Sequence, residues 1–197
     1  AYEIMPSLVG SEMCIRDRFN ETIIAINGST GKIIWRTGPA SARPFDEVPV
    51  DVEIADIDCD GATEVVALFA NFSLHDLKIS YGNSENITDY GWITTYNSSN
   101  GNQMWNVSVG APSLMALFVG LSANYLLTGN FMNESNGLNI ATVAAIAAYN
   151  VSYGDDEYLY NYALTLVNAT GRKITQKILG NMTPMAFEKG NLNGDNV

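Results

Sequence analysis

The stretch that decides the fold reads Asp56-Ile57-Asp58-Cys59-Asp60-Gly61-Ala62-Thr63-Glu64, and Val65-Val66-Ala67-Leu68 follows it directly. It places four carboxylates around one glycine. A hard cation such as calcium takes about six to eight oxygen ligands at flexible distances. If the backbone turns sharply at the glycine, these oxygens converge, and the stretch predicts a calcium site. The predicted ligands are Asp56, Asp58, Asp60, the Ala62 carbonyl and Glu64.

The same residues leave two alternatives to a calcium loop between strands. An EF-hand also begins with D-x-D-x-D-G, but it needs a bidentate Glu at the twelfth loop position and a helix on each side. Ala67 occupies that position here, and the flanks Val50–Ile54 and Glu64–Leu68 are short, β-branched and partly alternating, which favours strands. The second alternative is an acidic turn that binds no specific ion.

A tryptophan-bearing hairpin recurs along the chain. An apolar segment enters a polar Asn/Ser/Gly turn, and the segment that leaves it carries a tryptophan, which predicts two paired strands. The copies are Ile26–Trp35, Tyr96–Trp105 and a weaker Val167–Gln176, in which Gln176 stands near the place of the tryptophan. Their leading asparagines, Asn27, Asn97 and Asn168, are spaced by about 70 residues, which indicates a repeat architecture.

The acidic loop also has further copies. Near the end of the chain, Gly190–Asn196 places Asn191, Asn193 and Asp195 in the ligand positions, and these residues are weaker predicted metal ligands. The segment Gly129–Gly137 is a degenerate copy that has lost most of its charge, and we expect no ion there. A hairpin together with a loop-linked pair of strands makes about four strands per repeat, which is the content of a propeller blade.

These motifs resemble two families of propeller repeats. The acidic loop between strands is similar to the FG-GAP or VCBS repeats of integrin-α-type β-propellers. The hairpin Thr30-Gly31-Lys32-Ile33-Ile34-Trp35 resembles the PQQ-like, quinoprotein-type propeller repeat. The resemblance implies an all-β fold over residues 19–197, a partial β-propeller of about two to three four-stranded blades. It also implies that the loop residues named above hold Ca²⁺ between blade strands.

The two ends of the chain carry separate expectations. Residues 6–18 resemble the peptide produced when sequencing-adapter DNA is translated, so we expect residues 1–18 to be a non-native segment outside the fold. The alternative is a native N-terminal strand. Propellers close with about four to eight blades, and the last residues end inside a ligand loop. We therefore expect the chain to be a fragment of a longer protein, truncated at both ends.

Composition excludes some classes of partner. The chain has 21 acidic and 10 basic residues and a net charge of −11. This charge argues against nucleic acid, where basic patches supply most of the affinity, and against anionic lipid. Outside the excluded segment the one cysteine is Cys59, so neither a disulfide framework nor a cysteine-based zinc set is expected.

Ten Asn-x-Ser/Thr sequons favour an exported glycoprotein at the cell surface or outside the cell, although turn chemistry explains some of them. They begin at Asn20, Asn27, Asn71, Asn86, Asn97, Asn106, Asn133, Asn150, Asn168 and Asn181. Two apolar stretches, Ala111–Leu127 and Ile140–Tyr149, are too polar or too short for a membrane span. We expect both to be buried strands of the second blade, with a short helix over Ile140–Ala148 as the alternative.

The sequence contains no constellation that argues for catalysis. His75 is the single histidine, and neither a nucleophile motif nor a phosphate-binding glycine loop occurs. Trp35 and Trp105 are expected to dock neighbouring blades rather than to stack on sugars. The predicted function is calcium-supported adhesion or binding of a protein or glycan, without enzymatic activity. The alternative is the non-catalytic part of a propeller enzyme, either a quinone-dependent dehydrogenase or a polysaccharide lyase.

Overall fold

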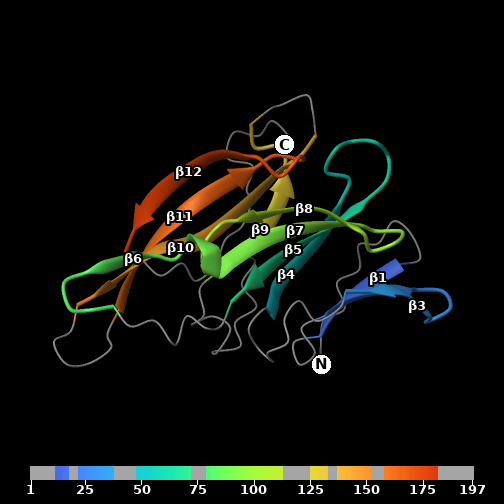
Figure 1. The fold of residues 1–197 in the computed structure, drawn as a ribbon. Coiled ribbons are helices and arrows are strands. Elements are labelled where there is room, and N and C mark those ends of the chain that lie inside the picture. The colour runs from blue at the N-terminus through green and yellow to red at the C-terminus, as the bar shows by residue number, and fades with distance from the viewer. Residues whose placement is uncertain are drawn as a thin grey trace.

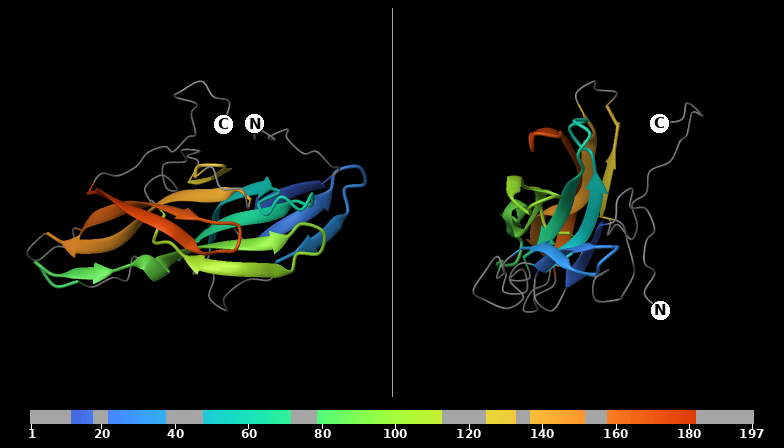
Figure 2. Two further views of the ribbon diagram at one scale, coloured as in Figure 1. Left: turned by 90° about the horizontal axis from the view of Figure 1, so that it is seen from above. Right: turned by 90° about the vertical axis from the view of Figure 1, so that its right-hand side faces the viewer.

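The computed structural model describes residues 12–17, 22–37, 48–71, 79–112, 125–132, 137–151 and 158–181. Within these ranges the protein is all-β, as predicted. The described residues form twelve strands in three antiparallel sheets (Figure 1), and the one helical element among them is the short 3-10 turn η2 (Thr88–Tyr90). The sheets follow one another in chain order across the molecule (Figure 2), as consecutive blades do in part of a β-propeller.

The first sheet has the order β1-β2-β3. Its strands are β1 (Glu12–Asp17), β2 (Thr22–Asn27) and β3 (Ile33–Arg36). Residues 1–18 are predicted to be a non-native segment outside the fold, but β1 pairs with β2 from Glu12↔Asn27 to Asp17↔Thr22. Without β1, the strand β2 would lie at the edge of the sheet and would present unpaired N–H and C=O groups that an extended neighbouring segment can fill. The adapter-like origin of residues 6–18 stays a prediction.

The second sheet is a four-stranded antiparallel meander with the order β4-β5-β7-β8. Its strands are β4 (Val48–Ala55), β5 (Glu64–Ala70), β7 (Gly91–Asn97) and β8 (Gln103–Ser108). The acidic loop joins β4 to β5, which confirms that it lies between two strands. The sheet therefore has the strand content of one propeller blade.

The third sheet contains the corresponding four strands in the order β9-β10-β11-β12. They are β9 (Leu126–Gly129), β10 (Asn139–Asn150), β11 (Tyr158–Val167) and β12 (Lys173–Gly180). The third sheet has a fifth strand, β6 (Ser84–Asn86), which lies between β5 and β7 in the chain and pairs with the far end of β10. The chain thus passes from the second sheet to the third and back, which connects the two sheets.

The structure groups the strands of the repeat into sheets differently from our expectation. Ile140–Tyr149 is a strand within β10, as predicted, and not a helix. It lies in the third sheet, however, and not in the blade that contains Trp105. A loop-linked strand pair joins the hairpin that follows it in the chain, so the acidic loop shares a sheet with Trp105 and not with Trp35. Residues 113–124 of the other apolar stretch lie outside the described residues.

The core consists of apolar layers between successive sheets. Along β5, Val65, Ala67 and Phe69 pack against the first sheet, while Val66, Leu68 and Ala70 pack toward the third. Every residue of β5 is buried. Strands covered on both faces are continuously apolar rather than alternating, which explains why this segment reads as an uninterrupted apolar run.

Two tryptophans connect the sheets, as the repeat predicted. Trp35 of β3 donates its Nε1–H to the Ser98 carbonyl of the second sheet at 2.6 Å. Trp105 of β8 donates in the same way to the Ala169 carbonyl of the third sheet at 2.8 Å. A buried indole thus satisfies its polar hydrogen while its ring fills the space between sheets.

Candidate metal centre

The acidic loop turns where the sequence predicts. β4 ends at Ala55 and β5 begins at Glu64, and the two residues are paired across the strands. Between them, Cys59 has a φ of 61° and Gly61 a φ of 92°. Glycine adopts positive φ at little cost, whereas a residue with a Cβ atom loses about 1–2 kcal/mol there. The loop therefore holds one strained, non-glycine position between two of its aspartates.

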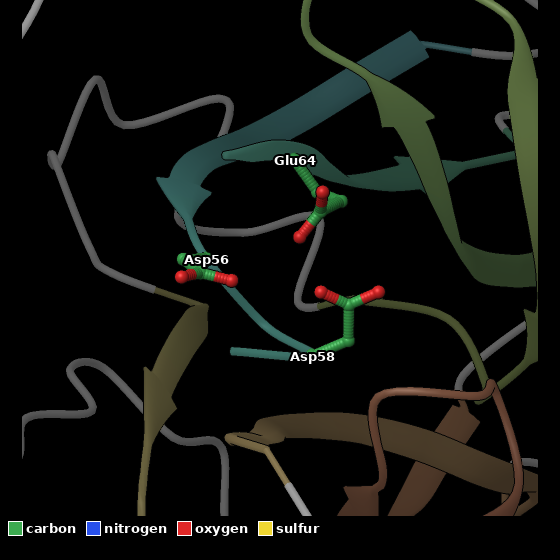
Figure 3. Close-up of side chains that lie close together, drawn as sticks. All are labelled: Asp56, Asp58 and Glu64. Carbon is green, nitrogen blue, oxygen red and sulfur yellow. The ribbon is translucent and has the colours of Figure 1, made fainter. Parts of the chain in front are cut away.

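Three of the predicted carboxylates converge. Asp56, Asp58 and Glu64 each offer one oxygen, and these oxygens all lie within 4.8 Å of one another (Figure 3). Oxygen ligands lie about 2.3–2.6 Å from a calcium ion. Two ligands on opposite sides of the ion are therefore about 5 Å apart, and the observed spacing suits a single cation of this size. The described acidic cluster could hold a metal ion.

Hydrogen bonds inside the loop organise it around Asp56. Its two carboxylate oxygens accept the backbone N–H groups of Asp60 and Gly61, each at 3.0 Å. The Asp60 carboxylate instead accepts the N–H of Ala62 at 2.8 Å, and it is not among the three that converge. Asp60 and the Ala62 carbonyl therefore stay predicted ligands, while the turn that they form brings the other three together.

Glu64 is the buried member of the cluster. Its side chain is 2% exposed, and Oε2 accepts the backbone N–H of Ile57 at 3.0 Å. Burial raises the pKa of this carboxyl, and the nearby carboxylates of Asp58, Asp60 and Asp56 raise it further, while the bond from Ile57 lowers it. A cation among these groups would replace their mutual repulsion with attraction.

The loop also contacts the next sheet. Ile57, between the first two aspartates, is fully buried, and its carbonyl accepts the N–H of Leu138 at 2.7 Å. Gly137 packs directly against that carbonyl and has a φ of 107°, so a side chain there would meet both strain and a collision. The candidate centre therefore lies where the second sheet meets the third.

The third sheet contains an uncharged counterpart of the loop. Gly129 and Asn139 are paired between β9 and β10 as Ala55 and Glu64 are between β4 and β5. Asn139 is 1% exposed, and its Oδ1 accepts the N–H of Met132 at 3.0 Å. An amide thus takes the position of the buried Glu64. The predicted degenerate copy ends at Gly137 and does not include Asn139. The register of β9 with β10, not the spacing of the motif, identifies Asn139 as the counterpart of Glu64.

The other predicted ligands, Asn191, Asn193 and Asp195, lie outside the described residues, as do His75 and the sequons at Asn20 and Asn133. Within the described ranges, part of the sequon pattern has a structural reason. The hydroxyls of Ser29, Ser99 and Thr170 donate to the side-chain Oδ1 of the asparagine two residues earlier, at 2.7, 2.6 and 2.9 Å. These Asx-type turns use an Asn-x-Ser/Thr sequence whether or not the asparagine carries a glycan.

Comparison with known proteins adds little about function. No protein-family model and no curated protein matches the chain. Solved structures that match include a europium-containing methanol dehydrogenase, with 10% sequence identity and a TM-score of 0.37; the match covers 88% of this chain. The chain spans 41% of that enzyme. A likeness at this level carries no functional argument. Among the described residues, no helix is long and apolar enough to cross a membrane.

Proposed function

We propose that the loop from Asp56 to Glu64 binds Ca²⁺ and that the ion serves a structural role in a β-propeller region of an exported or cell-surface protein. The observation that carries this proposal is the convergence of the Asp56, Asp58 and Glu64 carboxylates within 4.8 Å. The loop also contains the buried Glu64 carboxylate, whose pKa is raised first by burial and then by the negative charges of the neighbouring aspartates. Both features favour a bound cation.

The donor set favours calcium over other metals. All predicted donors are oxygens, which suit hard cations, whereas zinc and copper sites use histidine or cysteine. Cys59 is exposed and lies outside the converging group. Magnesium demands near-ideal octahedral geometry at shorter distances. A flexible loop that combines carboxylates with a backbone carbonyl accommodates the larger ion more readily.

The ion would act on stability rather than on chemistry. It would join the end of β4 to the start of β5 and neutralise carboxylates that repel one another in its absence. Because Ile57 packs against the third sheet between two of the ligands, the same loop supports the contact between sheets. The proposed biological role is adhesion or binding of a protein or glycan by a propeller that calcium keeps rigid. The family resemblance and the dense sequons support that role.

Calcium titration of the full chain tests the metal proposal. At a calcium concentration of about 100 times Kd, binding stabilises the folded state by about 2.7 kcal/mol. For a domain of this size, that corresponds to a rise in Tm of about 5–10 °C. We expect Asp58→Asn to abolish most of this rise and Asp89→Asn, an exposed aspartate in η2, to leave it intact. Equal melting temperatures with and without calcium would contradict the proposal, as would an equal response to magnesium.

A further inference from the structure

The sequons in the described ranges differ in how the fold uses their polar atoms. At Asn27, Asn97 and Asn168, the hydroxyl that completes the sequon donates to the asparagine Oδ1 and closes a turn. These three sequons therefore have a reason within the fold, and their presence does not by itself point to a glycan.

At two other sequons the fold uses the asparagine amide nitrogen, the atom to which a glycan would be attached. Asn150 is 7% exposed, and its Nδ2 donates to the Ile79 carbonyl at 2.6 Å. A glycan on this buried nitrogen would break the hydrogen bond and force apart close-packed neighbours. The Nδ2 of Asn106 donates to Thr94 Oγ1 at 2.9 Å. Both nitrogens are thus engaged in the folded protein.

The sequon Asn86-Ile87-Thr88 is of neither kind. All three residues of β6 are exposed, and Asn86 is the last of them. Its Oδ1 accepts the backbone N–H of Thr88 at 2.9 Å. Among the described residues, neither the Nδ2 of Asn86 nor the hydroxyl of Thr88 has a hydrogen-bond partner. The fold uses the backbone of Thr88 but not the hydroxyl that makes this segment a sequon.

The middle residue of the sequon fixes the position of Asn86. Ile87 is fully buried, and its N–H donates to the Ile146 carbonyl of β10 at 3.0 Å. It packs in an apolar cluster that includes Ile79 and Ala148. Asn86 is thus an exposed residue beside a firmly held one, so a bulky polar group on its side chain leaves the buried contacts of Ile87 intact.

We propose that Asn86 is an N-glycan acceptor. The proposal rests on the export of the protein proposed above, because such glycans are found on surface segments of secreted proteins. It is independent of the metal centre. The sequon at Asn86 combines an exposed, unbonded amide nitrogen with a threonine hydroxyl that the fold does not need, and no other sequon in the described ranges with all three residues described combines the two.

The chemistry of the transfer is compatible with the observed turn. The Nδ2 of Asn86 forms a bond to the anomeric carbon of a lipid-phosphate-linked oligosaccharide, and the bond from that carbon to the phosphate oxygen breaks. The lipid phosphate leaves with the electron pair, and one Nδ2 proton passes to a base. The product is still an amide, and its Oδ1 still accepts the N–H of Thr88.

The test secretes the full chain, behind a secretion signal, from cultured mammalian cells. Releasing the glycans with peptide N-glycosidase in heavy-oxygen water converts each occupied asparagine to a labelled aspartate, which mass spectrometry locates. We expect label at Asn86 and none at Asn150. Thr88→Val removes the hydroxyl but keeps the backbone N–H, and it should reduce the label at Asn86 at least tenfold. Thr88→Ser, which keeps a hydroxyl, should retain the label.

Unglycosylated protein from bacteria tests whether the Thr88 hydroxyl has a structural role instead. We expect Thr88→Val to change Tm by less than about 2 °C, as a surface substitution without lost contacts does. Thr170→Val is the matched control, because the hydroxyl of Thr170 donates to Asn168 Oδ1 at 2.9 Å. Its Tm should fall further, by about 2–4 °C.

Three results would overturn the proposal: secreted protein without label at Asn86, label at Asn150 equal to that at Asn86, or an equal loss of Tm in Thr88→Val and Thr170→Val. The secretion signal supplies the export, so the label at Asn86 tests the acceptor alone. The calcium response of Tm is measured on the bacterial protein. Failure of the metal centre and failure of the glycan acceptor are therefore separate results.

Discussion

The buried carboxylate of Glu64 accepts the backbone N–H of Ile57 at 3.0 Å, across a loop that holds three further carboxylates. A single charge-assisted hydrogen bond is worth about 1.5–3 kcal/mol. This hydrogen bond lowers the pKa of Glu64, whereas burial and the neighbouring carboxylates raise it. The bond does not offset these two effects, since the pKa stays above its ordinary value. Without an ion, the loop is therefore locally destabilised.

Glu64→Gln should consequently have opposite effects in the two ion states. Glutamine keeps an oxygen acceptor for the Ile57 N–H but carries no charge to desolvate. In a chelator at pH 7, we expect the variant to melt a few degrees above the unaltered chain; about 1 kcal/mol corresponds to about 2–4 °C for a domain of this size. In saturating calcium, the variant should melt below the unaltered chain. Scanning calorimetry in both buffers measures these melting temperatures. A variant that melts below the unaltered chain in both buffers would show that desolvation of the Glu64 charge does not dominate the stability of the loop.

The pH dependence of stability follows from the same raised pKa. A carboxyl whose pKa is higher in the folded than in the unfolded protein stabilises the fold below its unfolded value, here 4.5. That contribution is lost as the pH rises through the folded-state pKa. Urea unfolding in chelator should therefore show that the contribution of Glu64 to stability is smaller at pH 7 than at pH 4.5, and calcium should reduce the difference. A difference between the two pH values that calcium leaves unchanged would assign the effect to other groups.

The contact between tryptophan and glycine can be separated from backbone strain. Gly101→Ala adds a Cβ that collides with the Trp35 ring and also forces alanine into a φ of 72°. Gly82→Ala imposes similar strain at a φ of 76° with open space. Strain costs about 1 kcal/mol or somewhat more at both positions, while overpacking adds about 1–3 kcal/mol at the first. Urea titration followed by tryptophan fluorescence should show the larger loss for Gly101→Ala; equal losses would mean that the ring moves away freely.

The sequence predicted the features that depend on local chemistry. The acidic loop between strands, the turns at Asn27, Asn97 and Asn168, and the docking role of Trp35 and Trp105 all follow from residue types at fixed spacing. It did not predict which hairpin shares a sheet with the acidic loop, because neighbouring strand pairs are equally compatible in sequence. That choice depends on packing across sheets, as does the role of Asn139, which only the register of β9 with β10 reveals.

Side chains that hold an edge strand were also invisible in sequence. Asp51 and Glu53 lie two residues apart on β4, and both carboxylates reach the backbone of β9 in the third sheet. Asp51 Oδ2 accepts the N–H groups of Tyr125 and Leu126 at 2.8 and 3.0 Å, and Glu53 Oε2 accepts that of Thr128 at 2.6 Å. The two carboxylates thus take the place of a neighbouring strand along that edge of β9.

Removing one of them should loosen β9 selectively. Asp51→Ala leaves two N–H groups without their acceptor, at a cost of about 1–3 kcal/mol for each group that stays buried. Asp51→Asn should lose less stability than Asp51→Ala because it keeps an oxygen acceptor, but it should still lose some, because the bonds are then no longer charge-assisted. Hydrogen exchange of the Leu126 amide should accelerate in the order unaltered chain, asparagine, alanine. The Ile93 amide in the second sheet serves as the internal reference. Equal acceleration at both positions would indicate global destabilisation instead of the local release expected here.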